Sequence, residues 1–435
     1  MAPFPLPTLT VTNSSIERSQ PQLCDIWRDI QGANNWNGFL DPMNPILKGE
    51  ALRYGDFAQL CYDAFDGESY SKYYGTCKQS KRDLFNKMGM SGCGYEVTKY
   101  IYANTTGLSR FFGEKSKGKY FWIGFIAVST DPKEIKRLGR RDIVIAWRGT
   151  QTFQEWMQDL HDFLVPTSLS YKSDGHHYHQ PHGIRIERGF RLCYTSTIGE
   201  HENSQGKMTT MTTRDLLIEE VNRLLKVYEN DIANLSITFC GHSLGAALAT
   251  FSAYDVKQML NNNHLHDIPV TVFSFASPRV GNLAFAKQVE KIGVKVLRFV
   301  NKRDVVPQVP GVFMNEKMGW LSKLLNWLPW TYFHVGVEVS LANNSPHLDH
   351  TCNLAYLHNL EVYLHLLDGY VGRNKPYCSS GRDVALVNKK CDIITEKLGI
   401  PPHWWQLENK GLIKGTDGKW RQPTRSIKIA DSDEE

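Results

Sequence analysis

The chain has 435 residues, of which 41% are hydrophobic and 22% are charged, and its formal net charge at pH 7 is +5. This composition is ordinary for a globular protein whose core needs no disulfide bonds. The small positive charge does not argue for a nucleic-acid partner, although it is compatible with an anionic lipid surface. Because no run of eighteen apolar residues occurs, we expect no segment to span a bilayer.

The nine cysteines are scattered along the chain, and no Cys-x-x-Cys pair occurs among them. The sequence therefore indicates neither a zinc site nor a regular disulfide framework, and it favours a reducing compartment. Two bridges stay open as alternatives, Cys77 with Cys93 and Cys378 with Cys391.

Both ends of the chain are expected to be disordered, as a leader over residues 1–21 and an acidic tail over 426–435. Residues 1–20 lack the basic start and apolar core of a secretory signal. Arg18 is their only basic residue, which is a poor match to an organellar transit peptide. We therefore expect a cytoplasmic protein.

Between these ends we predict one domain over residues 22–425. Its first part, 22–110, is interpreted as a helical N-terminal cover with no visible chemistry. Within it, apolar residues recur at helical spacing over 50–65. A catalytic core over 120–370 and a C-terminal elaboration over 371–425 complete the predicted domain.

Two apolar runs open the core, at 120–129 and 142–147, and their separation fits a hairpin. An amphipathic stretch follows at 151–164. The next segment, 165–182, holds the histidines His176, His177, His179 and His182. These could bind a metal, but without cysteine and with only Asp174 as a nearby carboxylate, a solvated loop is favoured.

The most informative stretch is 235–250, where an apolar strand meets Gly-His-Ser-Leu-Gly and then small residues suited to a helix. A helix predicted over 213–228 leads into it. Glycines at 241 and 245 remove side chains that would collide in a sharp strand-to-helix turn, which leaves Ser243 exposed as a candidate nucleophile. The alternative is a glycine-rich connector without chemistry.

Two further strands are predicted after this turn, at 270–278 and 294–301, with a helix-compatible segment at 282–292 between them. Strands that alternate with helices indicate an α/β fold. We expect an α/β-hydrolase fold with a mostly parallel central sheet, a helical N-terminal extension and a C-terminal elaboration.

A serine nucleophile needs a base and an orienting carboxylate, which follow in the order Ser, Asp or Glu, His in this fold. Asp304 comes just after the strand at 294–301, so we expect it at the same sheet edge as Ser243; Asp267 and Asp255 are weaker rivals. The candidate bases are His334, His347, His350, His358 and His365. His358 is favoured because a helix begins just after it, and His365 is its main competitor.

The oxyanion of acyl transfer needs preorganised N–H donors. The backbone N–H of Leu244, directly after the nucleophile, is the first candidate. Thr150 is the second, because it closes the strand at 142–147 and follows Gly149, which lets the backbone approach closely. The alternative for Thr150 is a simple turn at the strand end.

These residues belong to a series of short motifs that follow one another in a fixed order along the chain. The series comprises Arg-Gly-Thr at 148–150, Gly-His-Ser-Leu-Gly at 241–245, Ser-Pro-Arg-Val-Gly-Asn at 277–282, Asn-Lys-Arg-Asp at 301–304 and His-Asn-Leu-Glu at 358–361. It is similar to that of class 3 lipases, and more narrowly of plant phospholipases A1 of the defective-in-anther-dehiscence-like group. The segments 27–32 and 404–411 resemble the two ends of that group, so the similarity covers residues 22–425.

The resemblance implies hydrolysis of the sn-1 acyl ester of phospholipids, and in some members of galactolipids or triacylglycerols. It also favours His358 over His365, because the family's base opens the His-Asn-Leu-Glu motif. Some relatives are plastid proteins, so the chloroplast is the alternative location. No metal or cofactor is expected.

Two segments fit contact with a membrane surface. Residues 312–330 concentrate Trp and Leu, typical of an interfacial helix, although a cap buried over the core is an equal alternative. The stretch 151–164 is a candidate lid. The rival functions are a non-catalytic lipase-like signalling scaffold and an acyltransferase.

Overall fold

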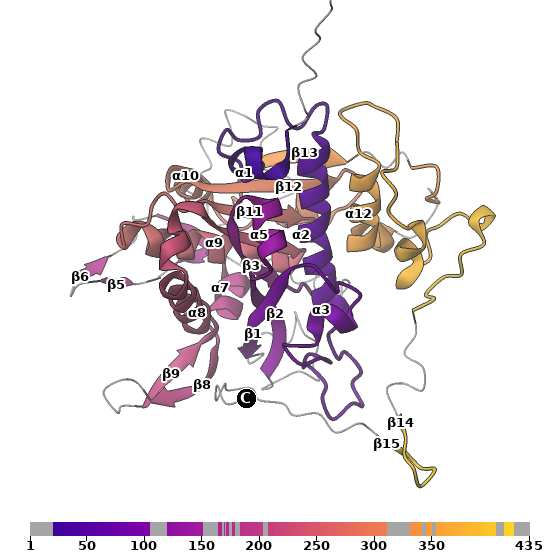
Figure 1. Cartoon of the computed structure of the whole chain (residues 1–435), viewed down its shortest axis with the longest axis horizontal. Coiled ribbons are helices and arrows are strands. Elements are labelled where there is room, and N and C mark those ends of the chain that lie inside the picture. Colours follow the sequence, from indigo (N-terminus) through magenta and orange to yellow (C-terminus); the bar gives the residue numbers. More distant parts are fainter. Residues whose placement is uncertain are drawn as a thin grey trace, which may run out of the picture.

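The structure is a computed structural model that describes residues 21–104, 120–150, 164–167, 169, 171–173, 176–178, 183–202, 208–310, 331–341, 345–349, 354–405 and 413–421. Over these residues a seven-stranded sheet is covered by helices on both faces (Figure 1). No helix within these ranges is both long and apolar enough to cross a membrane.

The strand order of the sheet is β1-β2-β3-β10-β11-β12-β13. The strands are β1 (Tyr95–Asn104), β2 (Tyr120–Ser129), β3 (Arg141–Trp147), β10 (Leu235–His242), β11 (Val270–Phe275), β12 (Val294–Asn301) and β13 (Val337–Leu341). The pairs β1/β2 and β2/β3 are antiparallel, while every pair from β3 to β13 is parallel. The predicted hairpin and the mostly parallel centre are therefore confirmed.

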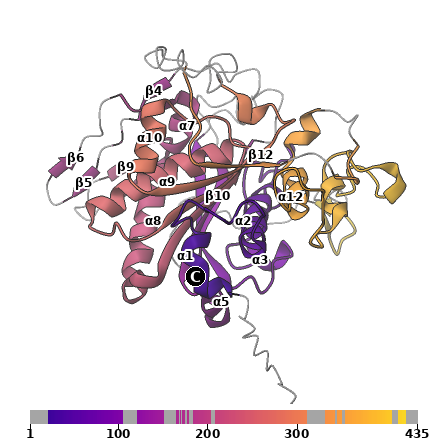
Figure 2. The same cartoon turned by 90° about the horizontal axis from the view of Figure 1, so that it is seen from above.

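The helices form two layers around this sheet (Figure 2). One layer holds α1 (Leu23–Ile30), α2 (Pro45–Asp63), α5 (Pro132–Leu138) and α12 (Leu360–Asp368), and the other holds α7 (Arg188–Tyr194), α8 (Thr213–Val227), α9 (Leu244–Asn262) and α10 (Leu283–Lys291). Because both faces are covered, all eight residues of β10 are buried, as a central parallel strand requires.

Short elements complete the described chain. The short helices are α3 (Leu84–Lys87), η2 (Glu229–Asn234), η3 (Val306–Gln308), η5 (Leu354–His358), η6 (Val384–Lys389) and η7 (Glu396–Leu398). The two-stranded pairs are β4 (Leu164–Pro166) with β7 (Arg185–Glu187), β5 (Tyr171–Ser173) with β6 (His176–Tyr178), β8 (Thr197–Glu202) with β9 (Met208–Thr212), and β14 (Ile413–Lys414) with β15 (Trp420–Arg421).

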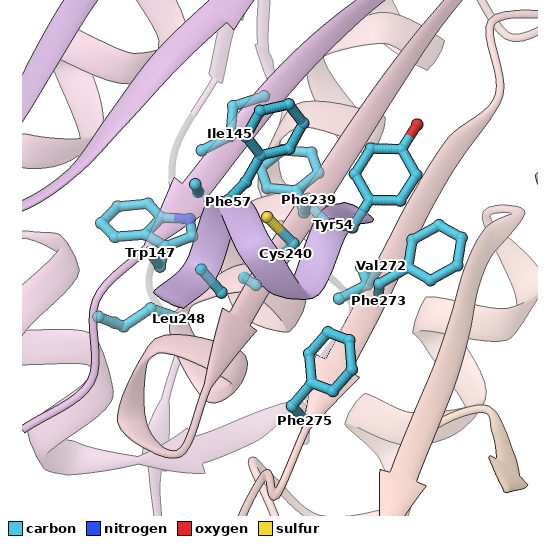
Figure 3. Close-up of a cluster of buried hydrophobic side chains, with 14 of the residues drawn as sticks. Tyr54, Phe57, Ile145, Trp147, Phe239, Cys240, Leu248, Val272, Phe273 and Phe275 are labelled. Carbon is cyan, nitrogen blue, oxygen red and sulfur yellow. The ribbon is translucent and has the colours of Figure 1, made fainter. Parts of the chain in front are cut away.

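Helix α2 crosses the sheet and supplies the aromatic centre of the core (Figure 3). The Tyr54 ring stacks on Phe273 of β11 with 4.6 Å between ring centroids. The Phe57 ring meets Phe125 of β2 edge to face at 6.4 Å. Such aromatic contacts add to area burial, so the N-terminal segment belongs to the same hydrophobic core as the sheet.

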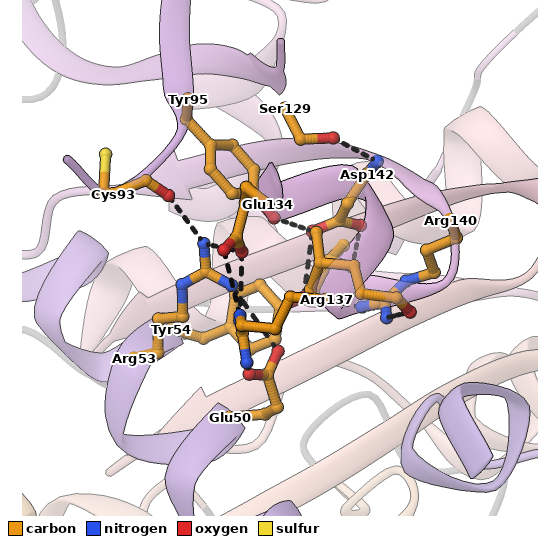
Figure 4. Close-up of polar contacts among 12 residues, drawn as sticks. Glu50, Arg53, Tyr54, Cys93, Tyr95, Ser129, Glu134, Arg137, Arg140 and Asp142 are labelled. Atoms are coloured by element: carbon orange, nitrogen blue, oxygen red, sulfur yellow. Dashed lines mark hydrogen bonds and ion pairs between the residues drawn. The ribbon is translucent and has the colours of Figure 1, made fainter. Parts of the chain in front are cut away.

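A buried polar cluster joins this helix to the amino-terminal edge of the parallel strands (Figure 4). The carboxylate of Asp142 is fully buried and accepts hydrogen bonds from the hydroxyls of Tyr54, at 2.9 Å, and Tyr95, at 2.8 Å. It also accepts from Ser236 Oγ at 2.6 Å, and Ser236 accepts from Arg140 Nε. A buried carboxylate with this many donors is well satisfied, so the cluster fixes α2 and β1 against the sheet.

The predicted cover over 22–110 is not wholly helical, because strand β1 lies within it and forms the edge of the sheet. Its faces are half exposed and its pairing with β2 is irregular, so its sequence lacks clean alternation. The described cysteines form no disulfide, so neither alternative bridge is present.

Several predicted features lie outside the described residues. They are residues 1–20 of the leader, 151–163 of the candidate lid, 311–330 with the aromatic segment, and the tail at 426–435.

Candidate active site

Ser243 lies at the sharp turn between β10 and α9, as predicted. Its backbone has φ 59° and ψ −126°, in the left-handed region that non-glycine residues rarely adopt. A Cβ at Gly245 would lie 2.5 Å from the Trp147 carbonyl oxygen, and one at Gly241 would lie 2.4 Å from the Gly245 carbonyl carbon. Glycine at both positions is therefore needed to hold the serine in this strained turn.

The surroundings of Ser243 suit a nucleophile. The predicted exposed position is wrong, because the residue is 2% exposed; its Oγ makes no hydrogen bond within the described part of the chain. It is also the N-cap of α9, so the positive end of that helix lies beside it. This end stabilises negative charge on the oxygen, as an alkoxide or as the oxyanion of an acylation intermediate.

Asp304 and His358 lie in hydrogen-bond contact, as an orienting carboxylate and a base would. His358 Nδ1 lies 2.6 Å from Asp304 Oδ2, and the residues are 7% and 1% exposed. Asp304 follows β12, and His358 is the last residue of η5. Because Nδ1–H donates to the carboxylate, Nε2 is the ring nitrogen that can take a proton from a serine hydroxyl.

Two further donors fix the Asp304 carboxylate. The backbone N–H of Val306 donates to Oδ1 at 2.9 Å, and the Tyr363 hydroxyl of α12 donates to Oδ2 at 2.6 Å. Burial and the neighbouring carboxylate both raise the pKa of Tyr363, so its hydroxyl stays protonated and remains a donor. The acid therefore has little freedom to turn away from the base.

His242 links the base to the N-terminal helix α2. Its Nε2 lies 2.7 Å from the backbone oxygen of His358, and its Nδ1 lies 2.8 Å from the Tyr62 hydroxyl. A carbonyl can only accept, so Nε2 carries the hydrogen and Nδ1 accepts from Tyr62. Burial, with a smaller effect of His358, lowers the pKa of His242 and keeps the ring neutral. Tyr62 and His242 thus position the backbone that carries the base.

We expect Tyr62→Phe to lower kcat about three- to tenfold with little change in KM, because it removes the hydrogen bond to His242 and a second one with the Gly149 backbone. Steady-state hydrolysis of a short-chain ester measures both constants. Tyr228→Phe, which removes a hydroxyl far from the site, serves as the control and should leave kcat unchanged. A rise in KM at constant kcat would instead place Tyr62 in substrate binding.

The rival histidines lie elsewhere in the described chain. His365 is buried, with its Nε2 2.7 Å from Ser345 Oγ, and His334 Nε2 is 2.8 Å from the Pro307 carbonyl oxygen. His334 lies shortly before β13. His350 lies outside the described residues. The choice of His358 over His365 is consistent with this geometry.

The rival carboxylates also have other surroundings. Asp255 is buried in α9, where it accepts from Tyr194 at 2.7 Å and from Arg214 Nε at 2.8 Å. The side chain of Asp267 is 97% exposed before β11, at the far edge of the sheet. Asp304 is therefore the carboxylate that pairs with a histidine beside Ser243.

The buried histidines make a prediction about acid stability. Burial lowers the pKa of His365 to about 4, with a smaller contribution from His347, whereas an unfolded histidine titrates near 6.5. Between these values the unfolded chain binds more protons, so stability falls as the pH falls. For His365 alone we expect a loss of about 2 kcal/mol at pH 5 relative to pH 7.5. Urea unfolding at both pH values should show a smaller loss for His365→Gln than for the wild type.

The two oxyanion candidates lie at the same sheet edge as the serine. Leu244 is the first residue of α9. Its N–H is therefore one of the first N–H groups of the helix, which have no acceptor within the helix. A Cβ at Gly149 would lie 3.3 Å from the Cβ of Ser243, which places the turn that carries Thr150 against the nucleophile. Both donors are consistent with an oxyanion hole.

A cavity of about 400 Å³ lies beside these groups. It is lined by Gln59, Tyr62, Thr150, His242, Ala355, Tyr356, His358, Asn359, Leu360 and Lys390. Thr150 and His358 therefore face the same cavity as side chains that can hydrogen-bond a polar group of a substrate.

No group of three or more potential metal-binding side chains lies within the described ranges. In the histidine-rich loop, His176 and His177 belong to β6, whereas His179 and His182 lie outside those ranges.

The sequence did not predict the roles of Tyr62, His242 and Tyr363. His242 lies inside the Gly-His-Ser-Leu-Gly motif and Tyr363 lies shortly after His358, so a local signal exists for both. Tyr62 is 180 residues from His242, and no sequence pattern marks it.

Comparison with known proteins gives consistent matches. A family model described as "Lipase (class 3)" matches residues 144–314. The chain is 46% identical over 427 residues to "Phospholipase A1-Igamma3, chloroplastic" of Arabidopsis thaliana, which covers 93% of this chain and 78% of that protein. It is 40% identical over 365 residues to "Galactolipase DONGLE, chloroplastic" of the same plant, which covers 82% and 71%. A solved lipase structure from Rhizopus microsporus var. chinensis aligns with a TM-score of 0.43 at 18% identity, over 69% of this chain and 77% of that one.

Proposed function

The chain belongs to the class 3 lipase family and is a carboxylic ester hydrolase, and we propose that it acts as a phospholipase A1 through Ser243, Asp304 and His358. The observation that carries this proposal is the 2.6 Å contact between His358 Nδ1 and Asp304 Oδ2 beside the strained serine turn. A histidine oriented by a carboxylate and a serine on a strained turn are two of the features that a serine hydrolase requires.

In the proposed mechanism His358 Nε2 takes the proton of Ser243 as Oγ attacks the ester carbonyl carbon. The resulting oxyanion receives hydrogen bonds from the N–H of Leu244 and from Thr150. His358 then gives its proton to the departing alkoxide oxygen, which leaves as the lysolipid, and an acyl-Ser243 ester remains. A water molecule repeats the sequence, so that fatty acid leaves and Ser243 regains its proton.

Asp304 stays ionised throughout this cycle. It holds the Nδ1–H tautomer of His358 and stabilises the positive charge that the ring carries in each transition state. The hydroxyl of Tyr363 and the N–H of Val306 keep the carboxylate in place.

The substrate class rests on the relatives and on the cavity. Curated relatives carry the names phospholipase A1 and galactolipase. The cavity beside His358 offers Gln59, Tyr356 and Lys390, which can hydrogen-bond a phosphate or a sugar head group. We infer a membrane phospholipid as the main substrate, reached by peripheral contact with the bilayer, with galactolipid as the second candidate.

We also infer a chloroplast location, because both Arabidopsis relatives described above are named chloroplastic. This favours the alternative from the family resemblance over the cytoplasmic expectation. Fractionation of plant cells that express the full-length protein, with plastid and cytosolic markers, tests it.

The proposed reaction is tested with phosphatidylcholine that carries different acyl chains at its two positions. Mass spectrometry should show release of the sn-1 acid and accumulation of the 2-acyl lysolipid. Release of the sn-2 acid would refute the proposed position, and no release from any lipid or soluble ester would favour the signalling scaffold. Transfer of the acyl group to added glycerol in preference to water would identify an acyltransferase.

A further inference from the structure

A second cavity lies at the edge of the sheet opposite Ser243. It has a volume of about 490 Å³, and its lining includes Pro269, just before β11, and Lys295, at the start of β12. Ser243 follows the other end of β10, so the length of a strand, roughly 25 Å, separates the two sites. The cavity therefore takes no part in the ester cleavage proposed above.

Four cationic side chains surround this cavity, namely Arg28, Lys257, Lys291 and Lys295. Within the described residues, none of them forms an ion pair with a carboxylate. Asp267 is the one carboxylate in the lining, and its side chain is 97% exposed to solvent. Like charges gathered around one cavity raise its affinity for an anion.

Part of this positive charge complements the carboxyl ends of helices α1, α9 and α10, which reach the same region. Each helix end carries about half a negative elementary charge. Even together with Asp267, these partial charges are smaller than the charge of the four cations. Helix capping therefore does not account for the whole cluster.

Lys257 lies at the base of the cavity and is 4% exposed. Its ammonium donates to the backbone oxygens of His266, at 2.7 Å, and Ile268, at 2.8 Å. An ammonium has three donors, so one remains for a ligand. Burial lowers its pKa to about 8 while Asp267 acts in the opposite direction, so the group is mainly charged at pH 7.

Two amide side chains of the lining residues each have one buried polar atom without a partner within the described residues. Gln31 is 1% exposed, and its Nε2 has no acceptor within the described residues, although its Oε1 accepts from Thr238. Asn261 donates from Nδ2 to the Ile292 oxygen, and its Oδ1 has no donor there. Both atoms are closed off from solvent, so the ligand contacts of this cavity come from its cations.

We propose that this cavity binds a small soluble phosphate or phosphate monoester through its cations. The phosphate oxygens would accept from the cations, including the remaining donor of the Lys257 ammonium. Charge-assisted hydrogen bonds from several cations suit a phosphate better than a single carboxylate. A soluble ligand is favoured over a lipid head group because the cavity lies at the opposite edge from the serine that must meet the bilayer.

Isothermal titration of the full chain with sn-glycerol 3-phosphate, inorganic phosphate and glycerol tests the proposal. We expect saturable binding of the two phosphates but not of glycerol, weakened about tenfold or more in the Lys291→Gln/Lys295→Gln variant. Lys133→Gln/Lys287→Gln removes the same charge from lysines outside the cavity and should bind like the wild type. Thermal unfolding of both double variants checks that they fold.

Ser243→Ala should bind glycerol 3-phosphate as the wild type does, which separates this site from the proposed catalysis. Absence of saturable binding, or an equal loss in the control variant, would overturn the proposal. A third arm uses vesicles of phosphatidylcholine with and without phosphatidate. If vesicles with phosphatidate bind through Lys291 and Lys295 while the soluble phosphates do not, the soluble ligand is refuted in favour of a head group.

Discussion

Replacing Ser243 with alanine is expected to lower kcat for phosphatidylcholine hydrolysis by a factor of roughly 10⁴ to 10⁶. The reason is that the acyl-enzyme route disappears with Oγ, so water must attack the ester directly. The oxyanion donors and the substrate cavity remain in place, which leaves a small residual rate. KM should change little, because Oγ makes no hydrogen bond within the described part of the chain and its loss opens little space.

Mass spectrometry of the released fatty acid is sensitive enough to measure kcat over the expected fall in activity. Ser252→Ala is the matched control, because Ser252 is also a buried serine of α9 and donates to the Leu248 oxygen within the helix. It should cost some stability while kcat stays within about twofold. Activity of Ser243→Ala above a few per cent of the wild type would remove Ser243 from the mechanism.

Much of the site was predictable because its chemistry follows short sequence patterns. Glycine is needed at 241 and 245, where β10 turns into α9, because a Cβ at either position would collide with neighbouring backbone atoms. The position of Asp304 at this edge could be predicted because parallel strands bring their carboxyl ends to one edge. His358 needed the family resemblance, since helical periodicity alone left His365 as a competitor.

The contacts that hold the base were less predictable because they join distant parts of the chain. Tyr62 was read as part of a cover without chemistry, yet its hydroxyl lies 2.8 Å from His242 Nδ1. A tyrosine in an amphipathic helix looks the same whether it packs in the core or donates to a buried ring. Strand β1 was missed for a related reason, because an edge strand with irregular register shows no regular alternation.

Replacing Asp304 with asparagine should lower kcat by roughly 10³ to 10⁴ through the state of His358. The carboxylate accepts from Nδ1–H, whereas an asparagine can present its NH₂ group to Nδ1 and stabilise the tautomer with hydrogen on Nε2. That nitrogen can then no longer take the serine proton. The loss of negative charge also removes the stabilisation of the imidazolium that forms in each transition state.

The direction of the other hydrogen bonds makes the wrong tautomer favourable in the Asp304→Asn variant. In the wild type the Tyr363 hydroxyl and the Val306 N–H each donate to one oxygen of the Asp304 carboxylate. The asparagine of the variant has one acceptor oxygen, and an NH₂ group replaces the other. If that oxygen accepts from Val306, the NH₂ group faces both Tyr363 and the ring, so the amide donates where the carboxylate accepted. Tyr363→Phe in the Asp304→Asn background should therefore add little further loss, whereas alone it should lower kcat several-fold.

Kinetics of Asp304→Asn, of Asp267→Asn and of the double variant separate this account from a general loss of fold. Asp267→Asn is the matched control, since it makes the same exchange at the exposed rival carboxylate, and its kcat should stay within about twofold. Circular dichroism and KM should be unchanged in all of them, because the orienting acid does not hold substrate. A kcat of Asp304→Asn within tenfold of the wild type would mean that another carboxylate orients His358. Among the carboxylates of the described residues, Asp304 is the one within hydrogen-bond distance of the His358 ring. Such a result would therefore contradict the orienting role that this contact indicates.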